Sequence, residues 1–132
     1  MARSIDLHVY SMKFSKEEVI AGRTYGLINL NETVTWKANH FGINFTMTSK
    51  ITAMEKPYCF TDEMIKGPFR KLHHQHLFKS LNSGTEMTDI FEFEAPLGAL
   101  GKLIERIILK NYMKNLLAER NNVIKKEAET CK

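Results

Sequence analysis

The chain has 132 residues, 43% of them hydrophobic, and a formal net charge of +4 from 19 basic and 15 acidic side chains. This length predicts one domain spanning residues 1–132, and the apolar content suffices for a real core, which excludes a disordered chain. The charge excess is mild and no basic stripe alternates with aromatic residues, so we expect no nucleic-acid partner. Cys59 and Cys131 lack metal-ligand spacing, which indicates free thiols in a reducing compartment.

The N-terminus, MARSID, lacks the apolar stretch of a secretory signal. Apolar runs elsewhere are far shorter than the roughly 20 residues that a membrane-spanning helix requires. We therefore expect a soluble, cytoplasmic protein without stable membrane insertion.

Secondary structure is predicted from apolar periodicity. Residues 2–12 carry apolar side chains without a clear period, which predicts a short helix or helical turn, and Gly22 and Gly26 indicate a loop. The period then changes to two over residues 33–40, 43–51, 58–64, 72–78 and 87–93. Turn signals separate these runs, so the pattern predicts a meander of five or six antiparallel strands with one apolar and one polar face.

A long amphipathic helix is predicted after Pro96 and Gly98 end the sheet, starting near Leu97. Its apolar face must be buried against another element, and the apolar face of the sheet is available. The predicted fold is therefore α+β, with a curved antiparallel sheet wrapped around one long C-terminal helix.

Three of the five histidines lie in the segment RKLHHQHLF, residues 70–78. Side chains alternate along a strand, so His74 and His76 should point toward the helix and His73 toward solvent. Asp62 and Asp89 share the inward face on the neighbouring strands. Asp62 should lie opposite His74 or one diagonal step away, and Asp89 opposite His74 or His76.

His40 joins this inward face from an earlier strand, which gives two carboxylates and up to three imidazoles in an apolar interior. Three interpretations remain open: a satisfied polar network, the polar end of a ligand cavity, or a metal site or catalytic acid–base pair. Buried charges must be paired in each of them. Carboxylates already paired with the histidines would not bind metal directly, and no further ligand is apparent, so we expect neither metal nor cofactor.

Several motifs together resemble one superfamily. They are NETVTW at residues 31–36, HFG at 40–42, FTDEMIKGPF at 60–69, HQHLF at 74–78, GTEMTD at 84–89 and APLGALG at 95–101. The chain resembles the START-like, or SRPBCC, superfamily over about residues 20–128, and within it ligand-binding bacterial proteins of the polyketide cyclase/dehydrase type. The resemblance implies a helix-grip fold, as in the birch-pollen-allergen group, with an apolar cavity between sheet and helix for lipids, polyketides or other apolar molecules.

The chain departs from this superfamily at its N-terminus, where relatives carry a further strand before a segment like residues 2–8. Without that strand one sheet edge lacks a partner, and its backbone groups can pair with another chain. We therefore expect a possible homodimer through the exposed sheet edge.

The leading hypothesis for function is a non-catalytic carrier or sensor that binds a small hydrophobic ligand. The alternative is a polyketide cyclase or dehydratase that uses an Asp–His pair as general base. A third interpretation is a solidly packed structural domain. The candidate ligand-binding residues are Trp36, His40, Phe45, Met47, Phe60, Asp62, Met64, His74, His76, Asp89 and Phe91 from the sheet, and Ile104, Ile108 and Leu116 from the helix.

Overall fold

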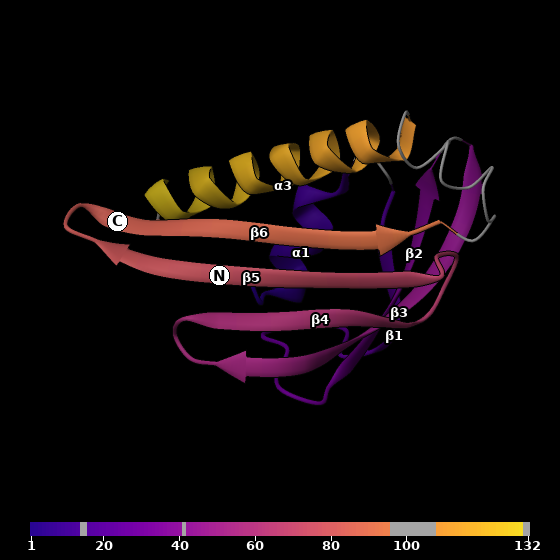
Figure 1. Ribbon diagram of the computed structural model, residues 1–132, viewed down its shortest axis with the longest axis horizontal. Helices are drawn as coiled ribbons and strands as arrows, with labels where there is room; N and C mark the ends of the chain where they lie inside the picture. The colour runs from indigo at the N-terminus through magenta and orange to yellow at the C-terminus, as the bar shows by residue number, and fades with distance from the viewer. Residues whose placement is uncertain (14–15, 41, 96–107, 131–132) are drawn as a thin grey trace.

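The fold is seen in a computed structural model, which describes residues 1–13, 16–40, 42–95 and 108–130. In chain order the elements are α1 (Ile5–Ser11), β1 (Glu18–Gly22), β2 (Thr33–His40), β3 (Ile43–Glu55), β4 (Cys59–Lys66), β5 (Lys71–Leu81), β6 (Gly84–Glu94) and α3 (Lys110–Thr130). The strands form one six-stranded antiparallel sheet in sequence order. Figure 1 shows α3 running beside β6 while the sheet curves away through β4 and β3. The predicted α+β fold is confirmed.

Most predicted elements are present in the described residues. The short helix expected within residues 2–12 is α1, and each of the five period-two runs corresponds to one of β2 to β6. Tyr58, the first residue of the run 58–64, lies in the turn before β4 and is exposed. The first strand, β1, was missed because Val19, Ile20 and Ala21 are consecutive apolar residues that show no alternation. The helix start expected near Leu97 lies outside the described residues.

Hydrogen bonds hold the N-terminal segment against the chain around Gly26. The amide of Ile5 donates to the carbonyl oxygen of Gly26 at 2.9 Å, and the amide of Gly26 donates to the Asp6 carboxylate at 2.9 Å. The guanidinium of Arg3 donates to the carbonyl oxygen of Ile28 at 2.8 Å. Helix α1 also packs against α3, so it covers part of the space enclosed by sheet and helix.

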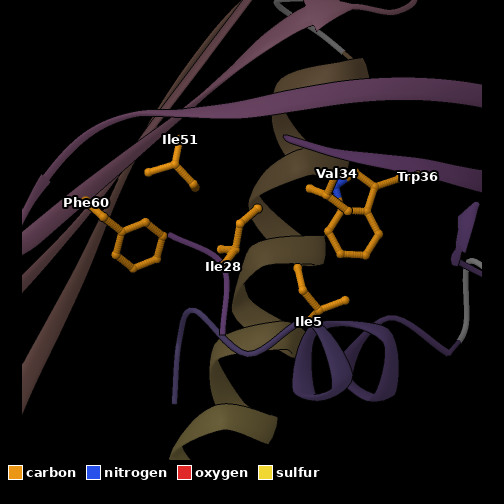
Figure 2. Packing of buried hydrophobic residues seen from close by; sticks show 6 residues of the cluster. All are labelled: Ile5, Ile28, Val34, Trp36, Ile51 and Phe60. Atoms are coloured by element: carbon orange, nitrogen blue, oxygen red, sulfur yellow. The ribbon is translucent and has the colours of Figure 1, made fainter. Parts of the chain in front are cut away.

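The apolar core lies where α1, the chain around residue 28 and the first four strands meet. Figure 2 shows its side chains converging from these elements, and none is more than 7% exposed. The cluster consists of Ile5, Ile28, Val34, Trp36, Ile51 and Phe60. Burying such a side chain contributes about 1.5–3 kcal/mol, so these contacts fix α1 onto the sheet.

The alternation in β5 sets the direction of its histidines. Leu72, His74 and His76 are buried, at 4%, 6% and 2% exposure. His73 lies on the opposite face, where its ring is 3.6 Å from the Glu92 carboxylate and its side chain is 26% exposed. The predicted register is therefore confirmed, although His73 is partly covered rather than fully exposed.

Gly22, at the end of the edge strand β1, provides a test of the sheet edge. Its φ is +77°, and an added Cβ would lie 2.3 Å from the carbonyl oxygen of Thr33 in β2. Gly42 has a similar φ of +75° but nothing within 4 Å of an added Cβ, so it is the matched control. Both Gly→Ala changes should cost the left-handed strain of about 1–2 kcal/mol.

Gly22→Ala should cost about 1–3 kcal/mol more than Gly42→Ala in the free energy of unfolding, because only Gly22 also meets a backbone atom. Urea denaturation of both variants measures the difference. Equal losses would show that β1 is not packed against β2 as described.

Candidate functional site

A cavity of about 340 Å³ lies between the inner face of the sheet, α1 and α3. Most of its lining side chains are apolar. Ten of the residues proposed from the sequence border it: Trp36, His40, Phe45, Met47, Phe60, Asp62, His74, His76, Phe91 and Leu116. The described structure thus brings together aromatic, aliphatic and ionisable groups around one cavity.

Three of the other proposed residues do not border this cavity. Met64 is half-buried and packs over Gly67, where a Cβ would lie 2.6 Å from its sulfur atom. Ile108 is 52% exposed, since the next residue, Leu109, occupies the inward position of the helix instead. Asp89 lies behind the histidine rings, bonded to them rather than facing the cavity. Ile104 lies outside the described residues.

Several cavity residues were missed in the sequence. The N-terminal segment contributes His8, Met12 and Glu17, which no periodic pattern marked. From α3, Tyr112 and Arg120 also border the cavity. Arg120 carried a usable signal, because a charged side chain at a position of the apolar helical stripe is rarely buried without a partner.

Asp62, His74, His76 and Asp89 form what we call the Asp–His cluster. Asp62 is directly opposite His74 between β4 and β5, and His76 is directly opposite Asp89 between β5 and β6. Both positions agree with the predicted register. The side chains nevertheless reach diagonally: Nε2 of His76 donates to Oδ2 of Asp62 at 2.9 Å, whereas Nδ1 of His74 is 3.7 Å from the same oxygen.

Asp89 contacts both imidazoles on their other side. Its Oδ1 lies 2.7 Å from Nδ1 of His76 and 3.2 Å from Nε2 of His74. Its other oxygen, Oδ2, accepts a hydrogen bond of 2.6 Å from Asn121 and lies 3.9 Å from Nη1 of Arg120. The Asp–His cluster therefore links three strands to α3.

The charge states follow from burial and pairing. Burial alone would raise the pKa of Asp62 and of Asp89, but bonds to the histidines outweigh it, and the pKa of each carboxyl falls below its usual range. Burial lowers the pKa of His74, and the carboxylates do not restore it. Burial also tends to lower the pKa of His76, but the contacts with the two carboxylates have the larger effect, so this pKa is raised. The proton of the pair is therefore held on His76, beside two ionised carboxylates and a neutral His74.

His40 does not join the Asp–His cluster, contrary to expectation. Its Nδ1 shares a hydrogen bond of 2.5 Å with the Tyr112 hydroxyl, and burial lowers its pKa. A further imidazole, His8, stacks on Trp36 with ring centroids 4.3 Å apart and bonds to Glu17 at 2.5 Å. The cavity therefore has two further polar pairs, His40 with Tyr112 and His8 with Glu17. Neither pair can be predicted from the periodicity of the strands.

Comparison with known proteins defines the fold. No family model matches the chain, and no curated protein matches it. Among solved structures, the protein TTHA0849 from Thermus thermophilus is similar with a TM-score of 0.71 and 15% identity, over 96% of this chain and 86% of that one. Ara h 8.0201 is similar with a TM-score of 0.58 and 12% identity, over 91% and 82%. These likenesses establish a helix-grip, Bet v 1-like fold.

Among the described residues, no helix combines the length and apolar character needed to cross a membrane.

Exchanging Asp62 for Asn tests the pairing within the cluster. The variant removes the charge bonded to His76 but keeps the shape of the side chain, so the pKa of His76 should fall, and that of His74 should change less. His73 lies on the opposite face and is the internal control, so its ring signals at one fixed pH should be the same in both proteins. NMR titration of the ring protons in both proteins measures this. A His76 titration that is the same in both proteins would contradict the pairing.

Proposed function

We propose that the protein is a cytoplasmic carrier or sensor that binds a small hydrophobic ligand, such as a lipid- or polyketide-like molecule, in the cavity. The observation that carries this proposal is a mainly apolar cavity of about 340 Å³ bordered by a few convergent polar groups. Small-molecule sites are typically about 300–1,000 Å³ with mainly apolar walls and a few polar groups that fix orientation. The cavity has both features.

Two regions of the cavity wall would contact different parts of the ligand. Trp36, Phe45 and Met47 offer apolar surface, whereas Asp62 and the two histidines of the cluster offer hydrogen bonds. Since His74 is the neutral ring, it can accept or donate according to its tautomer. A ligand with an apolar body and one hydroxyl or carbonyl group would satisfy both regions.

Membership of the START-like, or SRPBCC, superfamily is part of this proposal. The motif HQHLF supplies the inward histidines of β5, and FTDEMIKGPF supplies Phe60 and Asp62 of β4. The helix-grip fold is compatible with that assignment. The family motifs thus coincide with the polar border of the cavity.

A polyketide cyclase or dehydratase is the alternative function. The specific observation in its favour is a buried imidazole bonded to a carboxylate at the border of an apolar space, as His76 is to Asp62. Such a pair suits general acid–base catalysis near neutral pH. Mass spectrometry of protein purified under native conditions, coupled to chromatography, separates the two functions. A carrier retains an unmodified apolar molecule. An enzyme converts an added polyketone either to a cyclised isomer of equal mass and different retention time or, with loss of water, to a product of lower mass.

Pairing of two chains through β6 also belongs to the proposal. This strand has 11 residues, and within the described part of the chain its only sheet neighbour is β5. Long unpaired edges favour pairing with another chain. Sedimentation equilibrium at micromolar concentrations should then report two chains per particle, and a single chain throughout that range would contradict the pairing.

Filling the cavity tests ligand binding. Ala38 is 7% exposed and borders the cavity, so Ala38→Phe should place a ring inside it and lower the affinity for 1-anilinonaphthalene-8-sulfonate by about tenfold or more. Ala53→Phe makes the same change at an exposed position of β3 and should leave the affinity unchanged. Fluorescence titration of the two folded variants measures this. Equal affinities would place the bound probe outside the cavity.

A further inference from the structure

Three possible metal ligands converge at the border of the cavity. The Asp62 carboxylate and one ring nitrogen from each of His74 and His76 all lie within 4.8 Å of one another. All three residues line the cavity, and the side chains of both histidines are less than 10% exposed. We propose that Asp62, His74 and His76 bind one divalent transition-metal ion, of the Zn²⁺ or Fe²⁺ type, with its remaining coordination positions open to the cavity.

The two nitrogens of each ring have different neighbours. Nε2 of His76 and Nδ1 of His74 lie 2.9 and 3.7 Å from Oδ2 of Asp62. The opposite nitrogens, Nδ1 of His76 and Nε2 of His74, lie 2.7 and 3.2 Å from Oδ1 of Asp89. Histidines that bind metal ions commonly have their second nitrogen held by a carboxylate, which fixes the tautomer and the ring orientation. Asp89 is placed for this role on both rings at once.

The distances between the possible ligand atoms allow one metal ion to bind after small side-chain movements. Bonds of about 2.0–2.2 Å from one ion to nitrogen and oxygen ligands place neighbouring ligand atoms about 3–3.5 Å apart. The distances of 2.9 and 3.7 Å from the Asp62 oxygen to the two rings bracket this range. The expectation of no metal, drawn from the sequence, assumed that both carboxylates would be occupied by the histidines. In the structure Asp89 contacts both rings by itself, so Asp62 can bind the ion in place of the hydrogen bond that it now accepts from Nε2 of His76.

Charge and hydrogen bonding are both compatible with a bound cation. Two carboxylates contact the cluster, Arg120 is the one permanent cation that contacts it among the described residues, and a divalent ion bound at Nε2 of His76 would replace the proton held there. In addition, Nε2 of His74, Nδ1 of His76 and Oδ1 of Asp89 are buried without a well-aligned hydrogen bond, despite their short separations. Buried polar atoms rarely lack such bonds. A metal ion held by the opposite nitrogens would keep the ring protons on the two nitrogens that contact Asp89.

The residue types restrict the ion. Two imidazoles and one carboxylate suit Zn²⁺, Fe²⁺ and related ions, whereas Mg²⁺ and Ca²⁺ prefer oxygen ligands alone. Three protein ligands also leave at least one position for water or for an oxygen of a molecule in the cavity. The metal site goes beyond the proposed binding of an apolar ligand and does not depend on it.

Titration of the whole chain with metal ions tests the site. Protein dialysed against a chelator should bind one equivalent of Co²⁺, followed by visible absorption, and one of Zn²⁺, followed by calorimetry. His76→Ala and Asp62→Asn should each weaken binding by about 100-fold or more, and Asp89→Asn by about 10–100-fold, as for residues that orient metal ligands. His73→Ala, on the same strand but the opposite face, is the matched control and should bind as the parent protein does.

Circular dichroism of each variant separates loss of the site from loss of the fold, and Asp62→Asn keeps the side-chain shape if His76→Ala does not fold. Ala38→Phe should still bind metal, so a failure of apolar-ligand binding leaves this result intact. Absence of stoichiometric binding by the parent protein would overturn the proposal. So would equal affinity in folded His73→Ala and Asp62→Asn proteins, which would mean adventitious binding only.

Discussion

Two carboxylates buried on the inner face of the sheet are the constraint on which the rest of the structure depends. An isolated buried carboxylate is strongly unfavourable, so Asp62 and Asp89 require partners at fixed positions. Those partners are His76 and His74 in β5 and Asn121 and Arg120 in α3. The cluster therefore ties β4, β5 and β6 to the C-terminal helix, and it also borders the cavity. One set of contacts thus determines both the fold and the chemistry of the site.

The polar cluster and the apolar core meet at Phe60. This ring stacks on His76, with centroids 4.1 Å apart and 17° between the planes. It is also a member of the core cluster (Figure 2). A displacement of β4 would therefore disturb apolar packing and ion pairing together. Such coupling makes the position of Asp62 a consequence of the core, which favours a preorganised site over one formed only when a ligand arrives.

The strand pattern and the direction of the histidines could be predicted from the sequence. Side chains alternate with a period of two along a strand, and hairpin turns fix the antiparallel register. The sequence also identified Asp62 and Asp89 as neighbours of His74 and His76. Side-chain torsion angles decide which ring each carboxylate contacts, and these angles cannot be derived from sequence periodicity. Asp62 lies opposite His74 as predicted and 3.7 Å from its ring, but its hydrogen bond is with His76.

Contacts between distant segments also could not be predicted from the sequence. His8 on Trp36 and Tyr112 on His40 join the chain ends to the sheet, and neither contact leaves a periodic trace in the sequence. Ile108 was assigned to the cavity because several consecutive apolar residues fit the inward stripe of the helix. The structure turns Leu109 inward and leaves Ile108 exposed, a difference of one residue that an apolar run cannot resolve.

The central claim is that the buried histidines form the polar border of a ligand site. The most direct test follows the ring protons of His73, His74 and His76 by NMR while 1-anilinonaphthalene-8-sulfonate is added to the parent protein. We expect the signals of His74 and His76 to shift as the probe saturates, while those of His73, on the opposite face of the same strand, stay in place. Saturating binding that leaves His74 and His76 unshifted, or that shifts His73 equally, would contradict the claim.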